Sequence, residues 1–141
     1  MTKRCFPDVN VWFALAVADH PHHAAAMDWW NEDASLAGFC RLTQLGLLRL
    51  LTTASAMGGR PLTNAAAWSV YDNFLSDDRI QVFSEMPAIE ERFRALSTVR
   101  RASPKIWVDT YLAACAVAND AVLVTFDRAL AHYEIPCRIL A

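Results

Sequence analysis

The sequence lacks the cysteine patterns of secreted and zinc-binding proteins. Its four cysteines, Cys5, Cys40, Cys115 and Cys137, lie far apart, and no C-x-x-C pair occurs. Closely spaced cysteines are typical of disulfide frameworks and structural zinc sites, so the sequence disfavours both. Cys5 and Cys115 stand in apolar stretches, where a thiol behaves as a small hydrophobic side chain. We therefore expect dispersed, reduced cysteines in a cytoplasmic protein.

Long hydrophobic runs and a charge excess are also missing. No apolar run reaches the ~18 residues that a transmembrane helix needs. The basic residues Lys3 and Arg4 are followed by Pro7 and Asp8, and not by the apolar region of a signal peptide. The 13 Lys and Arg residues face 15 Asp and Glu residues, which gives a net charge of −2. A nucleic-acid partner would therefore need a local basic patch or bound metal ions.

What the sequence has in excess is apolar residues. A chain of 141 residues suits one domain, here residues 1–141, which can bury a core without disulfides or a structural metal. Hydrophobic residues make up 55% of the chain, and five of its residues are Trp. Trp12, Met27, Trp29 and Trp30 cluster in two short predicted helices, so they should not all fit the core side. We expect another chain to cover part of this apolar surface.

Strand and helix patterns alternate along the chain, with no repeat, low-complexity tract or interdomain linker. The predicted strands are 4–7, 36–40, 80–83 and 122–125, with a further edge strand at 137–140. The predicted helices are 9–18, 22–31, 42–53, 64–75, 87–96, 104–119 and 127–133. Thr63 and Ser103 are the expected N-caps of two of them, with Pro104 opening the second. The alternation predicts an α/β fold with a mainly parallel sheet.

Three aspartates, Asp8, Asp109 and Asp127, each close an apolar run. In an open α/β sheet the ligand crevice lies outside the carboxyl ends of the strands, so such acids can meet there. Clustered carboxylates repel one another, and a hard divalent cation such as Mg²⁺ relieves that repulsion. Taken singly, Asp8 and Asp127 are better explained as helix N-caps. Asp109 lies in the apolar helical stretch 106–113, where an unpaired carboxylate is costly, and it therefore favours a site.

The order of these segments resembles that of PIN-domain nucleases. The stretch Phe6–Trp12 is similar to the opening of that family, Trp107–Ala114 to its central acidic helix, and Val124–Arg128 to its last turn on the metal side. The lengths between the segments are similar as well, and the resemblance covers nearly the whole chain. Within the family, the chain looks most like the VapC-type toxins of bacterial toxin–antitoxin pairs. This resemblance implies a three-layer α/β/α sandwich with a short, mainly parallel sheet of four to five strands.

The same resemblance implies a Mg²⁺- or Mn²⁺-dependent ribonuclease that cuts RNA with a metal-activated water. Asp8 and Asp109 would be the main metal ligands. Asp127 would complete the acidic pocket directly or through water, and Thr125 would hydrogen-bond a carboxylate or a metal-bound water. PIN nucleases usually carry a fourth acid in the helix after the second strand, where this chain has Gln44. A Gln oxygen can ligate or orient water but adds no charge, so we expect weaker metal binding or the loss of a second metal site.

An RNA substrate would need cations near this acidic pocket, and six basic residues flank the segments that would form it. They are Arg41, Arg49, Arg100, Arg101, Lys105 and Arg128. Arg100 and Arg101 are the preferred phosphate-binding pair, although each cation also fits a solvated surface charge. Trp12 and Trp107 could stack on bases, with core or interface packing as the alternative for both. The three histidines of the segment 20–23 flank a proline and do not converge easily on one metal ion.

The partners implied by the resemblance are an RNA substrate, a second copy of the chain, and an antitoxin segment that covers the Trp-rich first two helices. No membrane partner is expected. Two other functions stay open. A non-catalytic PIN-like module that only binds RNA or protein is supported by Gln44. A phosphatase of the haloacid-dehalogenase kind is suggested by the segment 8–10, but its second acid is replaced by Asn10 and the later paired acids are missing.

Overall fold

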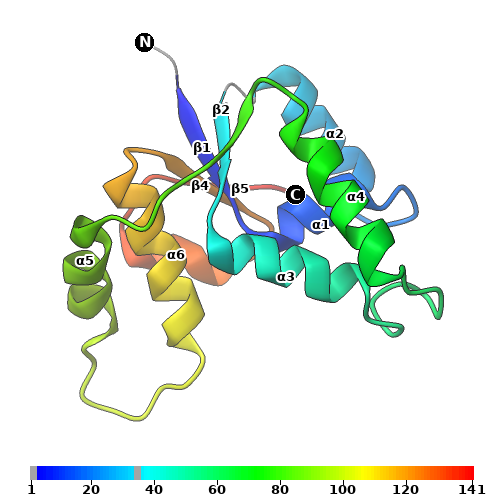
Figure 1. Cartoon of the computed structure of the whole chain (residues 1–141). Helices are drawn as coiled ribbons and strands as arrows, with labels where there is room; N and C mark the ends of the chain where they lie inside the picture. The colour runs from blue at the N-terminus through cyan, green and yellow to red at the C-terminus, as the bar shows by residue number, and fades with distance from the viewer. Residues whose placement is uncertain (1–2, 34–35) are drawn as a thin grey trace.

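The computed structural model describes residues 3–33 and 36–141, and strands alternate with helices along the chain (Figure 1). The strands are β1 (Arg4–Pro7), β2 (Leu36–Phe39), β3 (Ile80–Val82), β4 (Val122–Thr125) and β5 (Cys137–Ile139). The α-helices are α1 (Val9–Ala16), α2 (His23–Glu32), α3 (Arg41–Leu51), α4 (Asn64–Leu75), α5 (Pro87–Ser97) and α6 (Ile106–Ala118). A 3₁₀-helix, η1 (Arg128–Tyr133), precedes β5. All twelve elements correspond to predicted ones.

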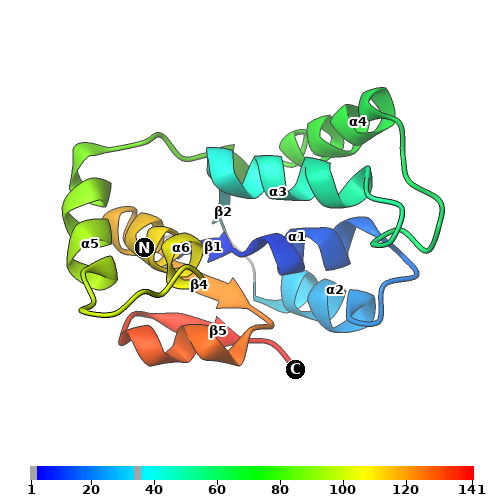
Figure 2. The same cartoon turned by 90° about the horizontal axis from the view of Figure 1, so that it is seen from below.

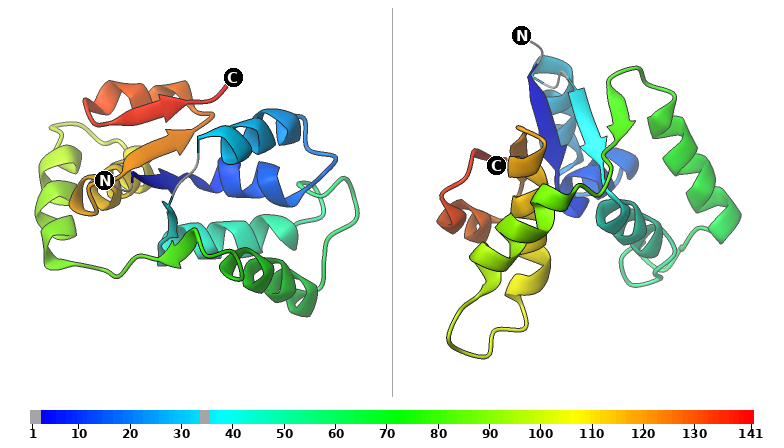
Figure 3. Two further views of the ribbon diagram at one scale, coloured as in Figure 1. Left: turned by 90° about the horizontal axis from the view of Figure 1, so that it is seen from above. Right: turned by 60° about the vertical axis from the view of Figure 1, so that its left-hand side comes forward.

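The five strands form one parallel sheet in the order β3-β2-β1-β4-β5. Every neighbouring pair is parallel, and β1 lies in the middle, with Pro7 opposite Val124 of β4 and Cys5 opposite Ala37 of β2. Pro7 ends β1, as expected for a residue that cannot donate a hydrogen bond within a sheet. The strands run side by side in Figure 3. The predicted parallel α/β sheet is confirmed.

Helices cover both faces of the sheet, because alternate strand residues point to opposite sides. Cys5 and Val124 belong to a hydrophobic cluster with side chains of α1 to α4. Phe6 and Leu123 belong to a second cluster with side chains of α5, α6 and η1. Figures 1 and 2 show the same division, with the α5–α6 pair on one side of the molecule and α1 to α4 on the other. The predicted three-layer sandwich is therefore confirmed.

Several helix ends follow local sequence signals. The Thr63 hydroxyl accepts a hydrogen bond from the Ala66 backbone N–H at 3.1 Å, so Thr63 is the N-cap of α4 as predicted. Gly46 lets α3 lie tightly against the start of α1, since a Cβ at this position would come within 2.6 Å of Val9 Cγ2. Gly58 and Gly59 take positive φ angles in the loop after α3, a conformation that glycine adopts without strain.

Three predicted helix ends differ from the structure by two residues. Helix α3 ends at Leu51 and not at residue 53. Helix α1 ends at Ala16 and not at residue 18, because the backbone is already extended at Val17. Helix α6 begins at Ile106, with Lys105 as its N-cap residue, and not at Pro104. Pro104 and Lys105 form a turn instead, so Ser103 does not cap the helix. The Ser-Pro pair is compatible with a turn as well as with a helix start, and the local pattern could not distinguish them.

Trp12, Met27, Trp29 and Trp30 were expected not to fit the core together, and for the three tryptophans this expectation is wrong. Trp12, Trp29 and Trp30 are all buried, and Met27 is half-buried. The Trp12 ring stacks on Phe39 with 3.9 Å between ring centroids, and it cannot stack on a base. The exposed large apolar side chains lie elsewhere, at Leu45, Trp68, Val82, Val99, Trp107 and Val108. Among the described residues, no helix has the length and apolar character needed to span a membrane.

Candidate active site

The strand order changes direction between β1 and β4. From β1 the chain proceeds to β2 and β3 on one side, whereas β4 and β5 lie on the other side. In open parallel sheets ligands bind outside the carboxyl ends of the strands at this switch point. Asp8 directly follows β1, and Asp127 follows β4 by two residues. Helix α6 leads into β4, so Asp109 in its first turn lies at the same edge of the sheet.

Three hydrogen bonds hold the Asp8 carboxylate, and the longest is donated by Asn10 Nδ2 to Oδ2 at 3.4 Å. Asp8 Oδ1 accepts from the Val9 backbone N–H at 2.7 Å, which makes Asp8 the N-cap of α1. Its Oδ2 accepts from the Thr125 hydroxyl at 2.9 Å. The Asp8 backbone N–H donates to the Val124 carbonyl at 2.8 Å and fixes the chain where β1 passes into α1. Asp8 is therefore a helix cap and, at the same time, a carboxylate fixed at the switch point.

Thr125 joins the ends of β1 and β4. Its side chain is fully buried, and its oxygen accepts from the Asp127 backbone N–H at 3.0 Å while its hydroxyl donates to Asp8. Asn10 completes the link, because its Nδ2 donates to the Thr125 oxygen at 3.2 Å and its Oδ1 accepts from the Phe126 N–H at 3.3 Å. The sequence analysis gave no structural role to Asn10. A polar side chain two residues after a strand-end acid, in the first turn of an otherwise apolar helix, was the available signal.

Asp127 and Asp109 are held more loosely than Asp8. Asp127 is exposed and caps η1, because its Oδ1 accepts from the Ala129 N–H at 3.0 Å. Asp109 is half-buried in the first turn of α6. Its neighbours Trp107 and Val108 are 56% and 50% exposed, so the start of this helix is not the buried apolar segment that the sequence suggested. The cost of burial is therefore a weaker argument for Asp109 than expected.

The three aspartates, with Thr125, form a region that we call the acidic site. Burial raises the pKa of Asp8, the bonds from Thr125 and Val9 lower it, and the charge of Asp127 raises it again. Burial raises the pKa of Asp109 as well, and the charges of Asp127 and Asp8 add to the effect. Since each carboxylate is repelled by the others, the acidic site favours a bound cation.

The donor atoms of the acidic site suit Mg²⁺ or Mn²⁺, which bind carboxylate and hydroxyl oxygens. The acids do not form a closed cage, however. Within residues 3–33 and 36–141, no group of three or more His, Cys, Asp or Glu side chains is placed to hold a metal ion. Both Asp8 oxygens and one Asp127 oxygen already accept protein hydrogen bonds. An ion that keeps several water ligands, as Mg²⁺ usually does, fits this open arrangement better than a fully protein-bound ion.

Gln44, which the resemblance placed at the position of a fourth acid, forms its hydrogen bond away from the acidic site. Its Oε1 accepts from Arg41 at 2.5 Å. Burial raises the pKa of the nearby Tyr71 hydroxyl, and the Gln44 side chain lowers it. The Gln44 side chain is buried and lines a cavity of about 350 Å³ that also contacts Phe83 and Glu85. These contacts attach Gln44 to α4 and to the end of β3, and not to the aspartates.

The three cations preferred for RNA binding lie at the surface, two of them in the loop between α5 and α6 and Arg128 at the start of η1. Arg100, Arg101 and Arg128 are exposed, and none of them forms an ion pair within the described part of the chain. Arg101 and Asp109 both lie near enough to the Tyr133 hydroxyl to affect its pKa. Burial raises the pKa of Tyr133, the charge of Asp109 raises it further, and the charge of Arg101 lowers it.

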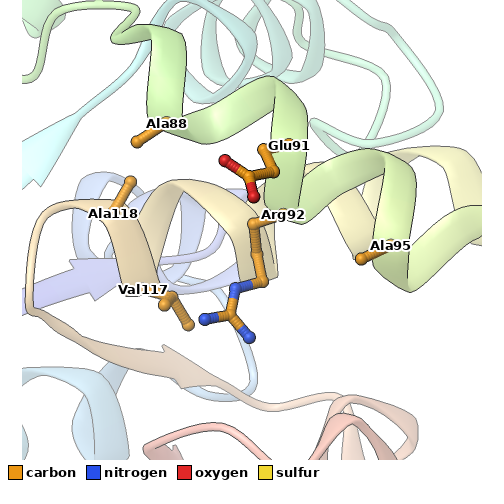
Figure 4. A pocket seen from close by; sticks show the side chains of 6 residues that line it. All are labelled: Ala88, Glu91, Arg92, Ala95, Val117 and Ala118. Carbon is orange, nitrogen blue, oxygen red and sulfur yellow. The ribbon is translucent and has the colours of Figure 1, made fainter.

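A separate pocket between α5 and α6 lies far from the acids. It has a volume of about 300 Å³ and is lined by Ala88, Glu91, Arg92, Ala95, Val117 and Ala118 (Figure 4). Val117 and Ala118 belong to the C-terminal end of α6, whereas Asp109 lies at its N-terminal end. This pocket is mostly apolar, with one acidic and one basic side chain, and it does not extend the acidic site.

The geometry agrees with the comparisons to known proteins. A model of the PIN domain matches residues 5–136. The chain belongs to the PIN-domain family. The PIN domain described here is 43% identical to the ribonuclease VapC41 of Mycobacterium tuberculosis, over 95% of this chain and 97% of that protein. It is 34% identical to the ribonuclease VapC29 of the same species, over 89% of this chain and 86% of that one. The predicted resemblance to VapC-type proteins is confirmed.

Two solved structures share the fold. One is VapBC2 from Rickettsia felis bound to a DNA fragment from their promoter, which matches with a TM-score of 0.68 at 12% identity and covers 98% of this chain and 99% of that one. The other is VapC20 of Mycobacterium tuberculosis, described as a sarcin-ricin loop cleaving toxin, with a TM-score of 0.66 at 16% identity over 93% and 95% of the two chains. At these identities the two matches support the PIN fold alone.

Proposed function

We propose that this PIN domain is a metal-dependent endoribonuclease that acts as the toxin of a toxin–antitoxin pair. The proposal rests on family membership, because the similar proteins VapC41 and VapC29 are named ribonucleases. The observation that carries it in the structure is the Asp8–Thr125–Asp127 arrangement at the switch point of the sheet. The proposal treats residues 1–141 as one PIN domain.

In this proposal the aspartates hold Mg²⁺, or Mn²⁺ in its place. Asp8 and Asp109 are the main ligands, and Asp127 contributes at the edge, directly or through water. A bound divalent cation supplies an activated water for hydrolysis and neutralises charge that develops on the scissile phosphate. Thr125 positions Asp8 through the 2.9 Å hydrogen bond and so keeps one carboxylate fixed at the site.

Charges around the acidic site would let RNA approach it. Arg100, Arg101 and Arg128 are exposed and free of ion pairs among the described residues, so they remain available to bind phosphates. We further propose a cognate antitoxin and a second copy of the chain as protein partners. The VapBC2 structure supports the proposal of an antitoxin partner by analogy.

RNA cleavage by the purified chain tests this function. We expect a structured cellular RNA to be cut in the presence of Mg²⁺ or Mn²⁺, and the cleavage to stop when EDTA removes the metal. Expression of the chain should arrest growth, and co-expression with the short protein encoded by the adjacent reading frame should restore it. Asp78→Asn is the control for substitutions in the acidic site, because Asp78 is an exposed aspartate in the turn before β3. This variant should cleave RNA as the wild type does. Cleavage that continues undiminished in EDTA would refute the metal-dependent mechanism.

A second candidate function is that of a PIN-like module that binds RNA or protein without cutting. Two observations favour it: the Gln44 amide oxygen accepts a hydrogen bond from Arg41 and not from a group of the acidic site, and the acids do not form a three-ligand cluster within the described residues. Under this alternative, RNA binds but no cleavage appears at any Mg²⁺ or Mn²⁺ concentration. A titration of both metals with one RNA therefore separates the two functions.

A further inference from the structure

A cavity of about 400 Å³ opens beside the start of α6. Its walls come from α5, from the loop that joins α5 to α6, and from the first turn of α6. It is lined by Glu90, Phe93, Arg94, Ser97, Thr98, Val99 and Trp107. The Trp107 ring rests edge-on against Phe93, with 6.2 Å between centroids, yet 56% of Trp107 remains exposed. Trp107 is therefore held in place from one side and open on the other.

The loop of residues 98–105 connects this cavity to the acidic site. Thr98 and Val99 line the cavity, and Arg101 follows only two residues later. Arg101 lies close enough to Tyr133 to influence its pKa, and Asp109 and Asp127 influence the same hydroxyl. In Figure 1 the loop hangs from the ends of α5 and α6, at the edge of the molecule where α6 begins. A ligand that passes from the cavity across the first turn of α6 would reach Asp109.

Trp107 and Asp109 point to different sides of α6. Residues two positions apart on an α-helix are separated by about 200° around its axis and by about 3 Å along it. Trp107 accordingly faces α5 and the cavity, whereas Asp109 faces Asp8 and Asp127. A helix is about 10–12 Å wide, so an extended nucleic-acid strand that crosses the N-terminal end of α6 would contact both residues.

The charges around Trp107 favour a nucleic acid over an apolar protein segment. Residues 99–105 contain the three cations Arg100, Arg101 and Lys105 and no acid. Single-stranded RNA is bound by cations on its phosphates together with aromatic side chains that stack on its bases. Among the tryptophans considered for stacking, Trp12 is buried, so Trp107 alone remains.

We propose that the cavity beside Trp107 is a base-stacking subsite for single-stranded RNA, about one or two nucleotides from the phosphate at the acidic site. Arg101 binds the backbone between the two positions. This inference rests on the proposed ribonuclease function, because it assigns a place to the nucleotide that flanks the cleaved bond. It also narrows the substrate class, since a base can stack on Trp107 only where it is unpaired.

The test measures binding and does not depend on cleavage. A fluorescein-labelled single-stranded RNA of ten nucleotides and the same RNA with abasic nucleotides are titrated by fluorescence anisotropy in EDTA. We expect Trp107→Ala to weaken binding of the intact RNA by about tenfold or more and to leave binding of the abasic RNA nearly unchanged. Trp107→Phe should restore most of the affinity, because it keeps an aromatic face.

Two further variants separate stacking from charge and from general surface effects. Arg101→Gln should weaken the binding of the intact RNA and of the abasic RNA by the same factor, because a phosphate contact does not depend on the base. Trp68→Ala should change neither, since Trp68 is 48% exposed but lies on α4. A midpoint temperature of thermal unfolding equal to that of the wild type shows that each variant is folded.

Three outcomes would overturn the subsite. In the first, Trp107→Ala binds intact RNA with unchanged affinity. In the second, it loses affinity for intact and abasic RNA by the same factor. In the third, the wild type sediments as a dimer and Trp107→Ala as a monomer. The last would assign this face to a second copy of the chain. If the variants change RNA binding as expected but the wild type cuts no RNA, only the nuclease proposal is refuted. If the wild type cuts RNA but Trp107→Ala binds RNA as the wild type does, only the subsite is refuted.

Discussion

Asp8 and Asp109 approach the acidic site from different parts of the fold and are held in different ways. Asp8 ends the central strand, and each of its carboxylate oxygens accepts a short hydrogen bond, from Val9 and from Thr125. Asp109 projects from the first turn of α6, and its carboxylate accepts no hydrogen bond from any residue that the structure describes. Asp8 therefore contributes to the folding of the sheet edge as well as to the acidic site, whereas Asp109 contributes chiefly negative charge.

The difference predicts how the two acids respond to substitution. Removing the Asp8 side chain takes away the N-cap of α1 and leaves the buried Thr125 hydroxyl without its acceptor. Removing the charge of Asp109 relieves repulsion from Asp8 and Asp127 and breaks no hydrogen bond among the described residues. An acid that is important for function but not for stability is typical of an active site.

The largest expected effect is on cleavage by the Asp109→Asn variant. We expect RNA cleavage to fall by at least about 100-fold, because the variant removes a proposed metal ligand. Even the loss of a group that only orients a ligand lowers metal affinity or activity by about 10- to 100-fold. The free energy of unfolding should change by less than about 0.5 kcal/mol. Asp8→Ala should lose cleavage to a similar extent but also about 1 kcal/mol of stability through the lost cap. Single-turnover cleavage and urea denaturation measure the two quantities.

Equal destabilisation by the two substitutions would contradict the comparison, and so would full cleavage by Asp109→Asn. Asp78→Asn serves as the reference, because Asp78 is exposed and precedes β3 at the opposite edge of the sheet. It should retain both cleavage and stability.

Thr125→Val should have the next largest effect. The substitution keeps the shape of the side chain but removes the hydroxyl that donates to Asp8 and accepts from the Asp127 N–H. We expect cleavage to fall by about 10- to 100-fold and stability to fall by about 1–3 kcal/mol, since the Asp127 N–H loses its acceptor and the Asp8 carboxylate loses its donor. Thr125→Ser restores the hydroxyl and should recover most of both. Recovery of stability without recovery of cleavage would contradict the assignment of the cleavage defect to the lost hydroxyl.

The raised pKa values of Asp8 and Asp109 predict an inverse pH dependence of stability. Because their folded-state pKa lies above the value of 3.8 that an ordinary aspartate has, the folded state binds protons more tightly than the unfolded state. Their contribution to stability is therefore greatest below about pH 3.8 and falls as pH rises through the raised pKa. Asp109→Asn should unfold about 1–2 °C above wild type at pH 7, in line with a change of less than about 0.5 kcal/mol, and the two should converge near pH 4.

Calorimetry over this pH range, with and without Mg²⁺, measures the effect. Saturating Mg²⁺ at pH 7 should reverse the difference and make wild type the more stable protein, since a cation that binds wild type more tightly than Asp109→Asn stabilises wild type more. A difference that stays constant from pH 4 to pH 7 would show that Asp109 is not repelled by its neighbours.

The smallest effect is expected for Gln44→Glu. The new carboxylate would lie 2.5 Å from Arg41 if it kept the position of the amide oxygen, so its charge would be neutralised away from the acidic site. We expect cleavage to change by less than about threefold. A steady-state comparison with wild type at limiting Mn²⁺ is sensitive to any added ligand. A rise of tenfold or more would place this position in the metal site after all.

Most of the fold could be predicted from the sequence, because strand and helix patterns are local. The strands 4–7 and 122–125 and the helix 64–75 have their predicted bounds. Their signals are strong: a continuous β-branched run at 122–125 and a Thr N-cap before residue 64. The start of α6 was missed because Ser103-Pro104 suits a turn as well as a helix, and contacts beyond the local sequence decide between them.

Less of the acidic site could be predicted, because it depends on side-chain directions. The sequence identified Asp8, Asp127 and Thr125 at the strand ends but not the role of Asn10, whose partners Thr125 and Phe126 lie more than 110 residues away. It also did not show that Gln44 bonds Arg41, or that Trp107 is exposed while Trp12 is buried. Helical spacing places a residue on a face, and tertiary packing decides what covers that face.

The central claim is that the carboxylates at the end of β1 and the start of α6 together bind a divalent cation. Isothermal titration of Mn²⁺ into wild type, Asp109→Asn and Asp78→Asn at pH 7 tests it most directly. We predict that Asp109→Asn binds Mn²⁺ at least about tenfold more weakly than wild type and that Asp78→Asn binds as wild type does. Equal Mn²⁺ affinity in all three proteins would contradict the account.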